Sequence, residues 1–466
     1  MTRLIRASAL ALAASSGWAL PAYASDAAIQ QELAAMRAEM ARMASRIDSL
    51  EGQLAAERTK TEAVQAKAEA ASAAVAAIPA QAAPSATAKP ATDVTWDGAP
   101  KLATKDGWSF KPRGRVQVDV AGVDAPDGIA GRTSLGIGTE FRRAYIGFDG
   151  TMPGGFGYRV EADLANSGVE LTDVYITYKA SPKLTFTIGQ HKPFQSMEDM
   201  TSDLFTSFME RAAFNSGFGF ERRVGVSGAY TGKQVLVQAG VFTDNAADLN
   251  LDTNNSYSLD GRVVFMPKLG KGQLHLGGSA HYRDFNDASA TARYSVRPFV
   301  HTTNLRLIDT RAFSASGERT FGAEFAYING RFHATAESQW MTAIRPGLAN
   351  ATFNGGFAEV GYLLTDDTTA YKNGAYDRIK PKRPAGKGGI GAVQVNLRYD
   401  WLDLNSGAII GGRQQVAGIS AAWMPIDYVR FIVNYGHIWI DDAAVPAGVN
   451  RNYTANALGM RAQIDF

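Results

Sequence analysis

The sequence predicts an all-β membrane protein, an antiparallel transmembrane β-barrel of about sixteen strands, preceded by an α-helical coiled-coil segment. Three observations lead to this fold class. Residues 108–466 repeat short segments of alternating apolar and polar side chains, and the chain starts like an exported protein. No later stretch holds the about eighteen apolar residues of a membrane helix. Because lipid offers the backbone no hydrogen-bond partner, strands that cross it must close into a barrel.

Composition excludes several classes of function. The chain has no cysteine, which rules out a disulfide framework and thiolate catalysis. Removing Arg3 and Arg6, which lie in the predicted signal, from the 47 basic residues leaves 45 against 45 acidic residues. No basic field therefore points to nucleic acid as a partner. The six histidines have no metal-ligand spacing and no hydrolase motif occurs, so we predict no metal, no cofactor and no enzymatic activity.

Residues 1–24 have the form of a secretory signal peptide. A basic start, MTRLIR, precedes an apolar stretch from Ala7 to Leu20 and the small-x-small sequence Ala22-Tyr23-Ala24. These three parts are typical of a segment that is cleaved during export. A retained membrane helix is the alternative, but the apolar stretch is short and serines interrupt it.

Residues 25–77 are predicted to form a periplasmic coiled coil. Apolar side chains recur in steps of four and three residues through four heptads, at Ile29, Leu33, Met36, Met40, Met43, Ile47, Leu50 and Leu54. Such a seam must be buried against another helix, most simply the same helix of another subunit. A single amphipathic helix lying on the barrel or a membrane is the alternative. Residues 78–107, rich in alanine and proline, are predicted to be a linker, and residues 108–466 the transmembrane β-barrel domain.

Alternation within 108–466 also predicts which side chains face the barrel interior. Val116, Val118 and Val120, for example, alternate with polar neighbours. Soluble sheets alternate too, so the export signal and the long loops carry the assignment to a membrane. The same parity places eight arginines on the polar faces: Arg113, Arg115, Arg143, Arg159, Arg223, Arg262, Arg283 and Arg398. A single β-bulge would invert the assignment within a strand.

The last predicted strand ends on an aromatic residue. Leu458, Met460, Ala462 and Ile464 share one face with Phe466. A terminal aromatic at such a position resembles the signal of outer-membrane proteins that the barrel-assembly machinery reads. We therefore expect the outer membrane of a diderm bacterium, its lipid and this machinery as the surroundings of the barrel.

Several segments resemble the phosphate-selective porin O and P family. The motifs are WSFKPRGRVQVDV (108–120), EFRRAYIGFDG (140–150), VELTDVYITYK (169–179), the TIGQHKPF to RRVGV block (187–226), RYSVRPFVHTTNLRLIDT (293–310) and RIKPKRPAGKGGIGAVQVNLRYDWLDLN (378–405). The resemblance implies a homotrimer of sixteen-stranded barrels, each with a pore narrowed by inward loops. Some relatives also carry a periplasmic coiled coil, which would give the heptads a partner.

The long connection between the alternating segments at Lys183–Ala229 is the predicted constriction. A sixteen-stranded barrel is too wide to select small anions unless a loop folds into it. Selectivity then needs several fixed cations, each weak enough to release the ion to the next. The predicted anion path, partly from alternation and partly from the resemblance, consists of Lys192, Arg143, Arg211, Arg223, Arg113, Arg115, Arg293, Arg297 and Arg306. For any single arginine the alternative is a salt bridge with a carboxylate of the lumen wall.

Three functions remain open at this stage. The first is a passive channel selective for phosphate, pyrophosphate or polyphosphate. The second is a porin of the same fold for another solute or for anions in general. The third is a structural protein that links envelope layers through the coiled coil.

Overall fold

A computed structural model describes residues 92–129, 135–165, 168–249, 256–287 and 289–466. The chain divides into two units, Met1–Ala88 and Lys89–Phe466, and all described residues belong to the second. The predicted signal peptide, the predicted coiled coil and residues 78–91 of the predicted linker lie outside the described residues.

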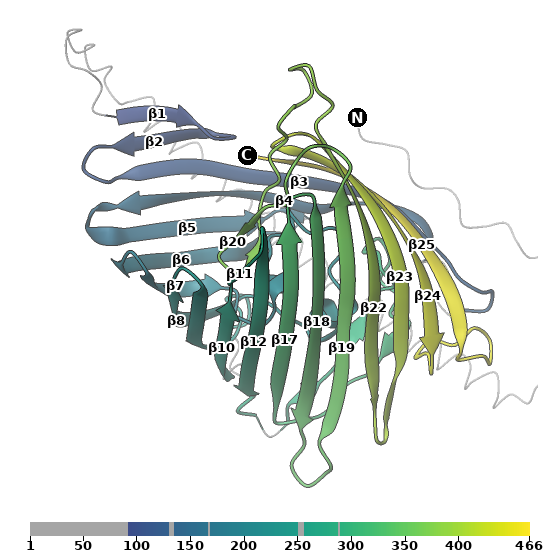
Figure 1. Ribbon diagram of the computed structural model, residues 1–466. Coiled ribbons are helices and arrows are strands. Elements are labelled where there is room, and N and C mark those ends of the chain that lie inside the picture. The colour runs from purple at the N-terminus through teal and green to yellow at the C-terminus, as the bar shows by residue number, and fades with distance from the viewer. Residues whose placement is uncertain (1–91, 130–134, 166–167, 250–255, 288) are drawn as a thin grey trace, which may run out of the picture. The chain divides into compact units, whose positions relative to one another are not determined.

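Sixteen antiparallel strands form a closed barrel, as predicted (Figure 1). Closure comes from β25, which pairs with β3 from Asn456 opposite Asp124 to Asp465 opposite Arg115. The barrel strands are β3 (Ser109–Asp124), β4 (Gly136–Met152), β5 (Phe156–Asp163), β6 (Glu170–Ser181), β7 (Leu184–His191), β8 (Arg223–Thr231), β9 (Val235–Phe242), β10 (Tyr257–Phe265), β12 (Gly272–Asp284), β17 (Gly317–Asn329), β18 (Phe332–Ile344), β19 (Ala351–Leu363), β22 (Ala392–Ser406), β23 (Ile409–Ile426), β24 (Val429–Asp441) and β25 (Tyr453–Asp465).

Shorter elements complete the described chain. The hairpin of β1 (Thr92–Trp96) and β2 (Pro100–Thr104) extends the sheet at β3. The remaining elements are β11 (Lys268–Leu269), β13 (Thr291–Ala292), β14 (Ser295–Val296), β15 (Ile308–Asp309), β16 (Phe313–Ser314), β20 (Tyr371–Lys372), β21 (Ala375–Tyr376), the 3-10 turn η2 (Pro153–Gly155), α2 (Met197–Met200) and α3 (Ala213–Gly217). In the part of the chain that the structure describes, no helix has the length and apolarity needed to cross a membrane.

Side chains alternate between the interior and the outer wall, with the order of a soluble protein reversed. Ile419 and Val433 are exposed on the wall, whereas Ser420 and Asn434 between them are buried inside. Polar-in and apolar-out is the pattern of a strand that faces lipid. The parity prediction holds for all eight arginines assigned to the polar faces, which are buried or half-buried.

A bulge in β4 changes this alternation at one point. The register between β3 and β4 shifts after Gln117, which pairs with Arg143, whereas the next residue, Val118, pairs with Phe141. Arg142 is therefore the extra residue, and both Arg142 and Arg143 face the interior. The bulge gives the wall two adjacent inward cations where strict alternation would give one.

The two ends of the barrel differ. The end that carries β1, β2 and Phe466, here called the terminal end, has short turns except for residues 364–391 between β19 and β22. This segment contains the basic tract 379–389. The opposite end, here called the loop end, carries the long connections 192–222, between β7 and β8, and 285–316, between β12 and β17. Buried apolar residues of these two connections, among them Phe208, Phe214 and Val300, form a core inside the barrel with wall residues.

Candidate functional site

The connection 192–222, here called the inward loop, is fixed to the barrel wall by hydrogen bonds from its own backbone. The carboxylate of Glu337 on β18 accepts the N–H groups of Met197 (3.0 Å) and Glu198 (2.8 Å) at the start of α2. Other wall side chains accept further loop N–H groups: Asp400 from Ala213 (2.8 Å) and Asn434 from Met209 (3.1 Å). Because buried N–H groups need acceptors, these contacts decide where the loop lies across the lumen.

Three cavities follow one another past this loop. The first, on the terminal side, has a volume of about 470 Å³ and is lined by nine basic and four acidic side chains: Lys111, Arg113, Arg115, Arg143, Arg159, Lys192, Arg211, Arg222 and Arg378, with Asp149, Asp173, Asp203 and Asp465. The second, of about 310 Å³, lies on the loop side. A third, of about 150 Å³, adds Arg297 and Arg306 from the connection 285–316.

The first and second cavities share a set of five charged residues, here called the gate: Arg143, Lys192, Asp203, Arg211 and Arg222. The second and third cavities share Arg142, Glu210, Arg211 and Ser216. Arg211 therefore lines all three. The three cavities are thus neighbours inside the barrel, and the gate between the first two carries four cations against one carboxylate, Asp203.

Lys192 lies where β7 ends and the inward loop begins. Its Nζ is 3.2 Å from Oδ1 of Asp199 and also donates to the Asp199 carbonyl oxygen. The side chain is about one-fifth exposed, at 19%. Burial, together with the nearby Arg211 guanidinium, lowers the pKa of Lys192 to about 8. The lysine is therefore charged at neutral pH, with a charge that a modest rise in pH removes.

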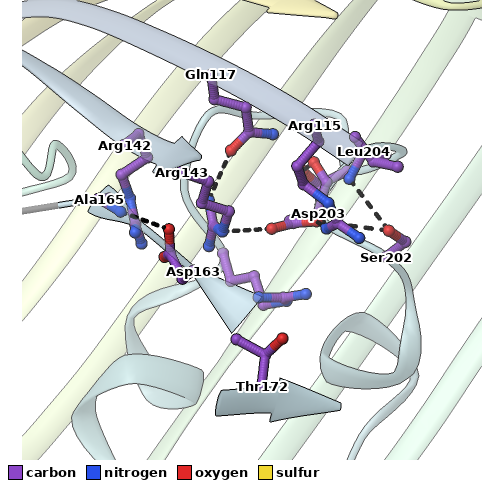
Figure 2. Close-up of polar contacts among 12 residues, drawn as sticks. Arg115, Gln117, Arg142, Arg143, Asp163, Ala165, Thr172, Ser202, Asp203 and Leu204 are labelled. Carbon is purple, nitrogen blue, oxygen red and sulfur yellow. Dashed lines mark hydrogen bonds and ion pairs between the residues drawn. The ribbon is translucent and has the colours of Figure 1, made fainter. Parts of the chain in front are cut away.

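Arg115 and Arg143 converge on Asp203 of the inward loop (Figure 2). Arg115 also lies 3.4 Å from Glu161, and its guanidinium is 4.5 Å from the centre of the Tyr145 ring. Burial alone would raise the pKa of Asp203, but the two arginines hold it well below its usual range. These arginines thus serve first as an anchor between wall and loop. Arg113 is similarly paired, with Asp149 at 2.8 Å and Glu161 at 3.1 Å.

Arg211, Arg297 and Arg306 differ from these, because none of them has a carboxylate within ion-pair distance among the described residues. Arg211 donates to the carbonyl oxygens of Glu198 (3.0 Å) and Thr201 (2.8 Å). Arg297 donates to the Thr303 carbonyl and the Asn304 side chain (both 2.9 Å), and Arg306 to the Asn304 carbonyl (3.0 Å). Carbonyl groups orient a guanidinium without neutralising it. Burial and Arg306 lower the pKa of Arg297 to about 10, so it stays charged at neutral pH.

Two residues of the predicted path, Arg223 and Arg293, line none of the three cavities. Arg223 is buried at the start of β8, 3.4 Å from Glu221, and its Nε and Nη1 have no hydrogen-bond partner. Arg293 is half exposed and pairs with Asp309 at 2.6 Å. Other inward arginines pair with carboxylates: Arg262 with Glu324 (2.8 Å), Arg283 with Asp244 (2.6 Å), Arg398 with Glu359 (2.7 Å) and Arg222 with Asp173 (2.6 Å).

Sequence reasoning missed three cations that line these cavities. Strict alternation from Arg143 would place Arg142 on the outer wall, but the bulge turns it inward, where it binds Glu210 through two contacts of 2.9 and 3.0 Å. Lys111 precedes the arginines of β3 on the same inward face. Arg378 directly precedes the basic tract 379–389, and it lies between the rings of Phe205 and Tyr428 at 5.1 and 4.8 Å. All three lie in motifs singled out in the sequence, and alternation alone would place Lys111 on the inward face with Arg113 and Arg115.

Solved structures of outer-membrane proteins have a similar fold. The structure resembles outer-membrane expressed OmpT of Vibrio cholerae, with a TM-score of 0.51 and 11% identity, over 78% of this chain and 99% of that one. It also resembles an anion-selective porin from Comamonas acidovorans, with a TM-score of 0.50 and 13% identity, over 77% and 100%. An uncharacterised protein of Caulobacter vibrioides is 41% identical over 449 residues, covering 94% of this chain and 90% of that protein.

A closed antiparallel barrel with an apolar wall and a charged interior defines an outer-membrane porin. The family model of the phosphate-selective porins O and P matches residues 110–466. The chain belongs to this family.

Proposed function

We propose that this protein is a passive outer-membrane channel for phosphate-type anions, such as phosphate, pyrophosphate or polyphosphate. One observation carries the proposal: the gate residue Arg211 lines all three successive cavities and has no carboxylate partner among the described residues. An anion that enters from the loop end meets Arg297 and Arg306 first, then Arg211 and Lys192, then the cations of the largest cavity.

The two kinds of cation have different tasks. Arginine keeps its charge, and its planar fork matches phosphate oxygens. Lysine is a compact donor whose three N–H groups can replace water around an ion at a narrow point. Because Arg115 and Arg143 are shared with Asp203, their pull on a passing anion is moderate. A series of moderate sites lets the ion move on, whereas one deep site would hold it.

The assembly proposed here is a homotrimer in the outer membrane. A trimer form of OmpT from Vibrio cholerae is among the proteins of similar fold. Within each subunit we propose a signal peptide over 1–24, a periplasmic coiled coil over 25–77, a linker over 78–107 and the porin domain over 108–466. The strand that ends at Phe466 is the proposed contact with the barrel-assembly machinery.

Conductance across a planar lipid bilayer tests the proposal. Millimolar phosphate should reduce the chloride current of the wild-type channel, and Lys192→Glu should abolish this block because it reverses one gate charge. Arg331→Gln, which removes an exposed arginine that pairs with Asp366 at a turn of the terminal end, is the matched control and should leave the block intact.

Other outcomes select the alternatives. Open channels that phosphate does not block would favour a general anion porin, which the pairing of Arg115 and Arg143 with Asp203 makes the second candidate. A protein that forms no channel would leave the envelope-linking role. An unchanged block in Lys192→Glu would remove Lys192 from the selectivity site.

A further inference from the structure

A groove crosses the outer wall of the barrel on the side of β7 to β17. Its floor is a row of small outward residues that are direct register partners on four successive strands: Gly228, Ala239, Gly261 and Ala280. Phe186 pairs with Gly228 at one end of the row, and Phe321 with Ala280 at the other. The cavity over this row has a volume of about 710 Å³.

Larger side chains border the groove on both sides at β8 to β10, and on the loop side also at β12 and β17. The next outward row toward the loop end consists of Val226, Val241, Leu259, Tyr282 and Arg319. The next one toward the terminal end has Tyr230, Val237 and Val263 and continues with the small residues Gly278 and Ala323. The large apolar members of both rows are exposed. A trough of glycine and alanine bordered by larger apolar side chains has the form that a hydrocarbon chain fits.

Arg319 is the charged member of the border. It is exposed on the lipid-facing side of β17 and also lines the cavity. No carboxylate of the described chain lies within ion-pair distance of it. The nearby outward carboxylate on β12, Asp284, accepts instead from the Tyr257 hydroxyl at 3.4 Å. Another outward arginine of the loop end, Arg413, has its charge matched by Asp403 at 3.0 Å.

From this arrangement we propose that the groove binds a membrane lipid whose headgroup carries a phosphate, with one acyl chain across the row of small residues and the phosphate on Arg319. An unpaired guanidinium next to hydrocarbon is costly, and a phosphate relieves that cost through charge-assisted hydrogen bonds. A second copy of the chain fits less well, because it would bury this arginine in an apolar interface.

The position of Arg319 also selects the leaflet. It lies two residues into β17, next to the connection 285–316 of the loop end. In the orientation expected for the proposed porin, the loop end faces the outside of the cell. The terminal end, which carries the first and last strands' chain ends, faces the periplasm. The lipid therefore belongs to the outer leaflet. The proposal rests on the outer-membrane location but not on the selectivity for phosphate-type anions.

Native mass spectrometry of the full-length protein in mild detergent tests the inference, with dipalmitoyl phosphatidic acid and dipalmitoylglycerol as probes. The wild type should retain phosphatidic acid about tenfold better than the phosphate-free lipid, the factor expected for one charged hydrogen-bonding group. Arg319→Gln should lose that preference, whereas Arg319→Lys should keep most of it. Arg413→Gln is the matched control and should bind like the wild type.

A second variant examines the floor. A Cβ at Gly261 would meet only the Gln238 carbonyl oxygen, at 3.8 Å, so Gly261→Leu can fill the groove without strain in the strand. It should weaken binding of both lipids. Equal retention of phosphatidic acid by Arg319→Gln and the wild type would overturn the proposal. It would also be overturned if the wild type bound no lipid and Gly261→Leu converted its trimers to monomers, because the groove would then be a contact between subunits. Chloride conductance, measured on the same samples, shows that each variant is folded and reports on the channel separately.

Discussion

Lys192 and Arg211 differ in the groups that their positive charges contact. Lys192 lies against Asp199, whereas Arg211 contacts only carbonyl oxygens within the described chain. The charges of these two neighbouring gate cations are therefore balanced by nearby groups to different degrees. The lysine also has a pKa low enough to titrate near physiological pH.

The anion selectivity of the channel should depend on pH because of Lys192. A lysine is charged below its pKa and neutral above it, so with a pKa of about 8 the gate loses one charge as pH rises from 7 to about 9. The reversal potential in a potassium chloride gradient should show selectivity falling over this range, since chloride itself does not titrate.

Lys192→Arg provides the control for this titration. Arginine keeps its charge throughout the range, so its profile should be flat. A wild-type profile that is also flat, or an arginine variant that falls in parallel, would contradict the assignment of the titration to Lys192.

Alternation in the sequence was sufficient to identify the inward arginines of the strands but not what they bind. Arg115 and Arg143 could be assigned to the interior from their apolar neighbours. Their shared partner Asp203 lies on a loop with no periodic pattern, and its position depends on long-range packing against the far wall. The inward position of Arg142 could not be predicted, because alternation within one strand does not show where a β-bulge inserts an extra residue.

At the scale of elements, the inward loop owes its position to acceptors on the opposite wall. Glu337 meets two consecutive N–H groups of the short helix α2, and Asp400 meets the start of α3. The sequence predicted that this connection folds into the barrel, because it is long and lies between two alternating segments, and the structure places it inside the barrel. Its conformation was beyond prediction, since the acceptors come from strands more than a hundred residues away in the chain.

Glu337→Gln should loosen the inward loop. A glutamine offers one acceptor oxygen where the carboxylate offers two, so one N–H of α2 is left unsatisfied at a cost of about 1–3 kcal/mol. Single-channel recordings should show larger current fluctuations at unchanged anion preference. Glu170→Gln, at the exposed start of β6, should record as the wild type does. Equally quiet currents in both variants would mean that other contacts suffice to hold the loop.

For the whole molecule, every described cation that lines the three cavities lies within residues 110–466, the part matched by the family model. The segment predicted to be a coiled coil lies outside this part. A shorter chain without the predicted coiled coil would therefore separate the barrel from this segment. The contribution of each part to assembly could then be measured independently.

Deletion of residues 25–77 should leave single-channel conductance nearly unchanged, because every described residue that lines the three cavities belongs to the barrel and its loops. Native gels should still show trimers, as expected if the barrel walls hold the subunits together. Monomers of normal conductance would instead assign assembly to the heptads, and loss of conductance would show that the deleted segment is needed to form the pore.

The pairing of β25 with β3 has a consequence for biosynthesis. The first strand of the barrel emerges long before β25 exists, and until then the edge of β3 from Arg115 to Asp124 has no neighbour within the described chain. In hydrocarbon such an edge is prohibitively costly, so the early strands must wait in an aqueous compartment or on a chaperone that shields them. A frameshift late in the coding region would therefore be as damaging as an early one, because it would produce an open sheet and no pore.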